Sequence, residues 1–373
     1  MYILLKKKKI LFINKKILFI VTFISLLFFW SLITSIVNET FDLVFISYFI
    51  SAILILGASY FVIDMMRLTH KNINFEIIAK YFTVTVFLQC SLAWIMFFSP
   101  ETKTSLLSLL ATTKYQEELF DETGSFRLVG FGSYFFVAGM INGSALLLIA
   151  EIVKKKTKLF SFLIWMFVFL FIFATGVMMS RTTLVGFGLA CLLLLYNYSK
   201  KRHGIIKILF SFIFVISILF VIYFNLPSSI KATIDLALNF GFELFVNMVN
   251  TGKVKTASTD HLFTMYHMPD NIMTYIIGDG YFSDPSNPEK YYMGTDVGFL
   301  RLILYFGLPG MIVYFLYQIY IIYYALKSNR VEHKMFFILL ILFIFILNLK
   351  GFTDILYVIA LFIFQRFSRF ENT

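Results

Sequence analysis

Three arginines stand beside apolar segments of this sequence. Arg127 lies in FRLVGFGS, Arg181 in MMSRTTLVGFG and Arg301 in GTDVGFLRLILYFGLPG. A charge beside a membrane core is costly, so it is usually paired or functional. The planar guanidinium group binds phosphate oxygens through two parallel hydrogen bonds. Three arginines at one membrane face are suited to hold a lipid diphosphate, although each could instead reach the interface or pair with a local acid.

Asp296 and two histidines are the candidate acid–base groups. Asp296 directly precedes an apolar segment, so it is placed either to cap a helix or to act as a base beside Arg301. His261 and His267 lie near aspartates in a long polar segment, where a histidine is either an ordinary loop residue or a catalytic group. We predict Asp296 as the base, with His261 or His267 in reserve.

Motifs for nucleotide or metal chemistry are absent from the sequence. It has no GxxxxGK[ST] loop, no HExxH pattern and no cluster of cysteine and histidine. The two cysteines, Cys90 and Cys191, stand inside apolar runs, as small buried side chains do. We therefore predict no metal and no cofactor, and a substrate that is activated before it reaches the protein.

The composition places these residues in a membrane protein. Of 373 residues, 60% are hydrophobic and 14% charged, whereas a soluble domain is about half apolar and a quarter charged. The apolar runs predict an all-α, polytopic transmembrane helix bundle with about ten spans. These spans are 17–37, 43–63, 77–98, 131–150, 159–178, 182–198, 208–224, 298–325, 335–349 and 355–365.

The last two predicted spans are short and are separated by Lys350, Gly351 and Asp354. As one helix, 335–365 would be about 46 Å long, which exceeds a hydrocarbon core of about 30 Å. Two short helices joined by a tight outer turn fit the membrane better.

Small residues and a proline predict details of the packing. Gly139 and Gly143 form a GxxxG pattern in the fourth span, and Gly186 and Gly188 lie in the sixth, so both spans should pack closely against neighbours. Pro309, followed by a glycine, predicts a kink in the eighth span.

The charges predict the side that each loop faces. Loops assigned to the cytoplasm hold 22 of the 32 lysines and arginines, starting with six lysines before the first span, as the positive-inside rule requires. The net charge of +11 is therefore a topology signal and does not indicate nucleic-acid binding. We predict a cytoplasmic N-terminus, a single membrane domain over 1–373, and long outer segments at 99–130 and 225–297.

The segments that carry Arg181 and Arg301 resemble a known family. MMSRTTLVGFGLA is similar to a Ser–Arg turn between two central helices of O-antigen polymerases of the Wzy type. IIGDGYFSDPS and GTDVGFLRLILYFGLPGMIVYF are similar to their Gly-x-Gly turn, outer loop and following helix. The number of spans and the large periplasmic loop late in the chain also resemble that family. O-antigen ligases share the plan but commonly carry a His-Asn pair where this chain has Asp296 and Val297.

The resemblance implies a glycosyltransferase of the bacterial inner membrane that acts in lipopolysaccharide biosynthesis. Such enzymes take the growing glycan from undecaprenyl diphosphate and transfer it to the next lipid-linked oligosaccharide repeat at the periplasmic face. Arg181 and Arg301, with Arg127 as a third, would stabilise the diphosphate, and Asp296 would activate the acceptor. The implied partners are membrane lipids, a chain-length regulator protein and a flippase. The alternatives are an O-antigen ligase and a flippase of lipid-linked sugars. A flippase would show inverted or parallel repeats, and this sequence has none that we detect.

Overall fold

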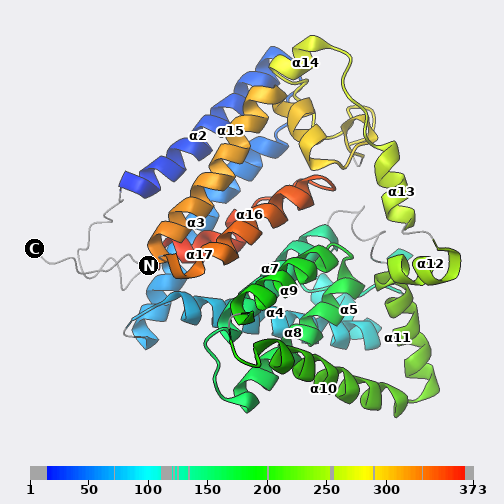
Figure 1. Ribbon diagram of the computed structural model, residues 1–373. Coiled ribbons are helices and arrows are strands. Elements are labelled where there is room, and N and C mark those ends of the chain that lie inside the picture. Colours follow the sequence, from blue (N-terminus) through cyan, green and yellow to red (C-terminus); the bar gives the residue numbers. More distant parts are fainter. Residues whose placement is uncertain are drawn as a thin grey trace, which may run out of the picture.

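Long apolar helices run side by side between two ends of the molecule (Figure 1). The computed structural model describes residues 15–70, 72–110, 120, 122–123, 126–132, 135–199, 201–252, 256–288, 290–329 and 331–365. In this part of the chain, seven helices are long and apolar enough to cross a membrane: α2 (Lys15–Val37), α3 (Val44–Thr69), α4 (Phe75–Phe98), α7 (Phe135–Val153), α8 (Leu159–Met179), α10 (Gly204–Phe224) and α15 (Gly298–Asn329). These runs fold as helices because a helix satisfies its own backbone hydrogen bonds in lipid.

The all-α, polytopic prediction is confirmed, but three predicted spans are shorter than a bilayer. α9 (Thr183–Tyr198) has 16 residues, α16 (Lys334–Asn348) has 15 and α17 (Leu356–Ile363) has eight. At 1.5 Å per residue, α17 is about 12 Å long, against a hydrocarbon core of about 30 Å. Many of their side chains are buried against neighbouring helices, so their length is set by protein packing. Helix length alone therefore identifies seven candidate spans, or eight if the bent pair described below counts as one, and leaves out α9, α16 and α17.

α16 and α17 form the expected pair of short helices joined by a turn. Residues 349–355 form this turn, which is anchored because buried Asp354 accepts hydrogen bonds from Tyr48 of α3 and from Gln318 of α15. At the other end of the pair, Phe75 stacks on His333, just before α16, and also contacts Phe362 of α17. The chain therefore turns back on itself between residues 348 and 356.

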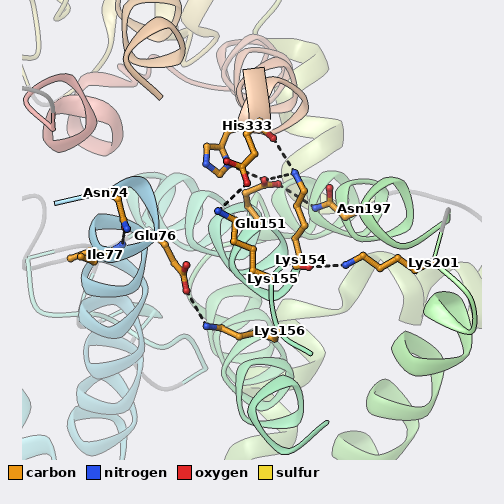
Figure 2. A network of polar contacts seen from close by, with 11 residues as sticks. Asn74, Glu76, Ile77, Glu151, Lys154, Lys155, Lys156, Asn197, Lys201 and His333 are labelled. Atoms are coloured by element: carbon orange, nitrogen blue, oxygen red, sulfur yellow. Dashed lines mark hydrogen bonds and ion pairs between the residues drawn. The ribbon is translucent and has the colours of Figure 1, made fainter. Parts of the chain in front are cut away.

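Side chains assigned to the cytoplasm gather at one end of the bundle, which we call the lysine end (Figure 2). Glu151, near the last turn of α7, lies 3.1 Å from the ammonium group of Lys154 and 2.9 Å from Nδ1 of His333, while Asn197 of α9 donates to it at 3.2 Å. Lys156 pairs with Glu76 of α4 at 3.0 Å. Other residues assigned to this side lie outside the described residues: Lys6, Lys7, Lys8, Lys9, Lys71, Lys200, Arg330, Arg366 and Arg369.

Glycines allow α7 to lie against α9 and against the turn between α8 and α9. A Cβ atom on Gly186 would lie 2.3 Å from Cα of Gly143, and one on Gly139 would lie 1.8 Å from Oγ1 of Thr182. Such distances are impossible for a larger residue, so the prediction of close packing at these three glycines is confirmed. The prediction is wrong for Gly188, because nothing lies within 4 Å of its Cβ position.

The kink in α15 falls at Gly307, two residues before Pro309, where the backbone has φ 70° and ψ 178°. Pro309 has no N–H group to donate, and its ring clashes with the carbonyl four residues earlier, so the helix cannot continue regularly. Glycine is the residue that best tolerates the positive φ angle of the break. The carbonyl groups near the break accept hydrogen bonds from other segments. The backbone N–H of Asp279 donates to the carbonyl of Leu304 at 2.6 Å, and the indole of Trp30 donates to that of Phe306 at 3.0 Å.

The segment 225–297, predicted as one large loop, is partly helical. α11 (Ser228–Gly241) and α12 (Glu243–Thr251) are bent by 81° and could count together as one broken span. However, α11 begins just after α10 and ends where Gly241 contacts Val177 near the end of α8, so it crosses the ends of these helices (Figure 1). The remaining short elements are α5 (Pro100–Leu107), α13 (Ala257–Thr264), α14 (Ile272–Ile276), η1 (Tyr292–Gly294) and η2 (Val331–His333).

We expect a reporter fused to the C-terminus to lie on the cytoplasmic side. The reason is that α16 and α17 bring the chain back to the lysine end, whose charge favours the cytoplasm. A C-terminal green fluorescent protein should fluoresce and a C-terminal alkaline phosphatase should be inactive. The opposite pair of results would mean an odd number of crossings.

Substitution of Gly186 by alanine should destabilise the bundle by about 1–3 kcal/mol, because the added methyl group would overlap the backbone of Gly143. Thermal unfolding of the purified protein in detergent measures this loss. Gly188→Ala is the matched control, since its Cβ position is open, and it should unfold at the wild-type temperature or slightly above. Equal effects of both substitutions would contradict the packing described.

Candidate functional site

The candidate site residues lie at the end of the bundle opposite the lysine end, which we call the arginine end. α7 starts here and its last turn holds Glu151, so its 19 residues separate the two ends by about 28 Å. Three connections meet at this end: the turn between α8 and α9, the start of α15, and the turn between α16 and α17. A Cβ atom on Gly298, the first residue of α15, would lie 2.7 Å from the carbonyl oxygen of Gly351, in the turn between α16 and α17. A Cβ atom on Gly351 would lie 3.2 Å from the ring of Phe136, near the start of α7. These segments are therefore closely packed.

Arg127 and Arg181 share one aromatic ring. Their guanidinium carbons lie 5.2 and 4.5 Å from the ring centre of Phe240, at the end of α11, within the range of a cation–π contact. Nε of Arg127 donates to the carbonyl of Met179 at 2.8 Å, and Nε of Arg181 donates to that of Phe240 at 3.1 Å. Two arginines 54 positions apart in the sequence are therefore neighbours, as expected from their predicted shared face.

Burial and the nearby charge of Arg181 lower the pKa of Arg127 to about 10. Arg127 still carries its proton at neutral pH, but its charge is held at an energetic cost. No carboxylate in the described part of the chain lies within ion-pair distance of Arg127. An anion bound here would relieve that cost.

Arg181, unlike Arg127, has a carboxylate partner. Its Nη1 lies 2.7 Å from Oε2 of Glu243, the first residue of α12. Burial lowers the pKa of Arg181, and the charge of Glu243 opposes that shift. Sequence reasoning missed Glu243, because the bend that brings α12 back to the turn between α8 and α9 is a tertiary feature.

Asp296 and Arg301 form an ion pair at the start of α15, with Nη1 of Arg301 3.2 Å from Oδ1 of Asp296. The guanidinium group lies between two rings, 3.7 Å from the centre of Phe282 and 3.8 Å from that of Tyr291. Arg301 is only 6% exposed, whereas the side chain of Asp296 is 37% exposed. Asp296 therefore faces the site, and Arg301 stands behind it.

The pKa of Asp296 is raised, because burial of the residue outweighs the opposing charges of Arg301 and Lys350. A raised pKa brings a carboxyl group closer to the range in which it exchanges protons at neutral pH. The ion pair and the partial exposure thus fit Asp296 for proton transfer.

Lys350, in the turn between α16 and α17, is a fourth cation of this end. Burial lowers its pKa, the charges of Arg181 and Arg127 lower it further, and Asp296 raises it. Lys350 is therefore within electrostatic range of both arginines and of the carboxylate. In the sequence, Lys350 indicates only a break between two spans. The signal that could have identified it is a lysine in an outer turn, against the positive-inside rule.

The two histidines are placed differently. His261 on α13 and His267 after it are both exposed, and among the described residues no hydrogen bond or ion pair joins either imidazole to Asp296 or to the arginines. The loop itself reaches the site, because the hydroxyl of Tyr266 donates to the carbonyl of Leu349 at 2.6 Å. His267 follows that contact directly.

Among the described residues, those that surround the site are four cations, namely Arg127, Arg181, Arg301 and Lys350, and two carboxylates, Glu243 and Asp296. The excess of positive charge, set in a partly desolvated surface, suits an anion that carries more than one negative charge. Within the described ranges, no group of three or more histidine, cysteine, aspartate or glutamate side chains is arranged to hold a metal ion.

Comparison with models of known protein families, with curated proteins and with solved structures finds no significant match for this chain. The geometry of the site therefore carries the functional argument.

Substitution of Asp296 by alanine should lower the stability by about 3 kcal/mol or more, because it leaves the buried guanidinium of Arg301 without its carboxylate. Adding Arg301→Met should restore most of that loss, since an apolar side chain fits between Phe282 and Tyr291. Thermal unfolding of both single variants and the double variant measures the coupling. Losses that simply add would argue against the pair.

Proposed function

We propose that this protein is a glycosyltransferase that polymerises lipid-linked oligosaccharides. Its substrates would be undecaprenyl-diphosphate-linked repeats, and the arginine end would face the periplasm of a bacterial inner membrane. The observation that carries the proposal is the convergence of Arg127, Arg181 and Lys350 beside a carboxylate at one end of a membrane bundle.

The cations would stabilise the leaving group of the transfer. The bond between the anomeric carbon of the donor glycan and its phosphate oxygen breaks, and the electron pair leaves with the lipid diphosphate. Arg127, Arg181 and Lys350 carry the charges that can neutralise this developing anion, and preorganised cations of this kind lower the barrier. A pre-activated donor of this type requires no nucleotide-binding loop, in agreement with the sequence.

Asp296 would act as the base. As the anomeric carbon bonds to a hydroxyl oxygen of the acceptor repeat, the hydroxyl proton passes to the carboxylate. Arg301 is buried behind Asp296 and fixes its orientation, so we assign Arg301 to positioning the base instead of to direct contact with the diphosphate. His261 and His267 remain reserve candidates, in the segment that contacts the site through Tyr266.

Two related functions are alternatives. An O-antigen ligase would use the same donor with a different acceptor. A flippase would use broken helices to line a path through the membrane. The break at Gly307 could serve such a path, but neighbouring segments occupy the carbonyls of Leu304 and Phe306. This packing favours a fixed structure, and hence an enzyme. A chain-length regulator and a flippase would then be separate partner proteins.

Arg181→Ala should abolish long-chain polysaccharide while the protein is still made, because the leaving group loses a cation. Lys350→Met should have the same effect. The measurement is the chain-length pattern of surface polysaccharide on a gel, in a deletion strain that carries each variant, with membrane levels checked by immunoblot. Arg202→Ala, at the lysine end, is the control and should give wild-type chains.

The same gel separates the alternatives. Loss of a polymerase leaves a single repeat attached, loss of a ligase leaves no attached glycan, and loss of a flippase removes even the single repeat. Normal chain lengths in Arg181→Ala would contradict the role assigned to that residue.

A further inference from the structure

A small cavity lies at the arginine end of the bundle, where α4 ends and α5 begins. Its walls are Met96, Phe97, Pro100, Lys103, Arg127 and Val129. The corner is fixed by Ser99, whose hydroxyl accepts a hydrogen bond from the backbone N–H of Thr102. Pro100 then starts α5 and prevents α4 from continuing straight. The cavity is thus built by the fold and opens next to a residue of the proposed site.

Two cations line this otherwise apolar cavity. Arg127 has no carboxylate within ion-pair distance among the described residues, and its positive charge lies close to that of Arg181. Lys103 lies on α5 and donates a hydrogen bond to the carbonyl of Phe120 at 3.0 Å. A lysine here departs from the positive-inside rule, since this corner belongs to the end predicted to face outward. The combination favours an anion that touches both cations.

The size of the cavity restricts the anion. Its volume is about 100 Å³, whereas sites for drug-sized ligands are about 300–1,000 Å³. It has room for a phosphate group but not for an oligosaccharide repeat. Any larger molecule that binds here must leave its remaining parts outside.

The surroundings indicate that the remaining part is a lipid chain. Trp94 lies against the rings of Phe97 and Phe98, and such aromatic groups mark the level of the lipid headgroups. The cavity lies at the end of α4, one of the helices that are long and apolar enough to cross a membrane, and therefore at the depth of the headgroups. A phosphate bound at this depth can belong to a lipid whose chains enter the bilayer.

We propose that the cavity between α4 and α5 binds a phosphate group of a membrane lipid. Arg127 belongs both to this cavity and to the proposed site that it forms with Arg181 and Lys350. The assignment of that lipid as the isoprenoid carrier of the glycan rests on the proposed function. In that case the cavity is the place where the carrier's phosphate enters the site, and Lys103 is a binding residue. A phosphate of an ordinary phospholipid is the other source of the same chemistry.

The test is lipid binding to the full chain in nanodiscs of phosphatidylcholine, measured by native mass spectrometry. The probes are undecaprenyl phosphate, phosphatidylglycerol and inorganic phosphate. Lys103→Gln should weaken binding of undecaprenyl phosphate about tenfold, as expected for one charge-assisted contact, and Lys103→Arg should preserve it. Val129→Phe, which fills the cavity without changing charge, should also weaken binding.

Lys231→Gln is the matched control. The ammonium group of Lys231 also donates to a backbone carbonyl, that of Phe224 at 2.7 Å, but Lys231 does not line the cavity. Its substitution should leave binding unchanged. Unfolding temperatures of all variants identify any that fail to fold. If Lys103→Gln does not fold, the proposal is tested by the other two variants: Lys103→Arg should bind like the wild type and Val129→Phe should bind more weakly.

Each outcome decides the proposal. Competition by phosphatidylglycerol at equal concentration would support a lipid phosphate from the bulk membrane, and its absence would support the carrier. Wild-type binding by both Lys103→Gln and Val129→Phe would overturn the site, as would equal binding of inorganic phosphate without a lipid chain. A wild-type protein that binds the lipid but polymerises no glycan would remove the proposed function and leave this site standing.

Discussion

The close approach of α7 to α9 is the contact on which the arginine end depends. Gly143 and Gly186 let the two backbones touch, and Gly139 lets the turn that carries Arg181 lie against α7. Because lipid provides no hydrophobic driving force between helices, small residues that permit such contact supply the packing energy. The position of Arg181 relative to the start of α7, and hence to Arg127, follows from this contact.

The second constraint is that backbone groups inside a membrane must find partners within the protein. The break at Gly307 obeys it, since Trp30 and Asp279 occupy the carbonyls near the break. The turn between α16 and α17 obeys it too, because Asp354 and Gln318 bind its backbone N–H groups. These anchored irregular segments hold the charged groups of the arginine end in fixed positions.

The charges divide the molecule into two ends with different chemistry. At the lysine end, Glu151 pairs with Lys154 and His333, and Glu76 pairs with Lys156, so these carboxylates have their partners within the protein (Figure 2). At the arginine end, Arg127 keeps a charge that no described carboxylate pairs. An unpaired cation in a desolvated place is a cost to the fold, which an anionic ligand removes.

The sequence by itself determined the membrane class, most helix positions, the turn near Lys350 and the proximity of Asp296 to Arg301, because hydropathy and local spacing act over short distances. The ion pair between these two residues is seen only in the structure. The sequence did not determine how long each helix is or how deeply it is buried among its neighbours. It therefore predicts α9, α16 and α17 as full spans, whereas these helices are shorter and packed inside the bundle. Only the tertiary structure decided that Glu243 pairs with Arg181 and that Lys350 joins the arginines, because these contacts depend on how α12 and the last turn fold back over the bundle.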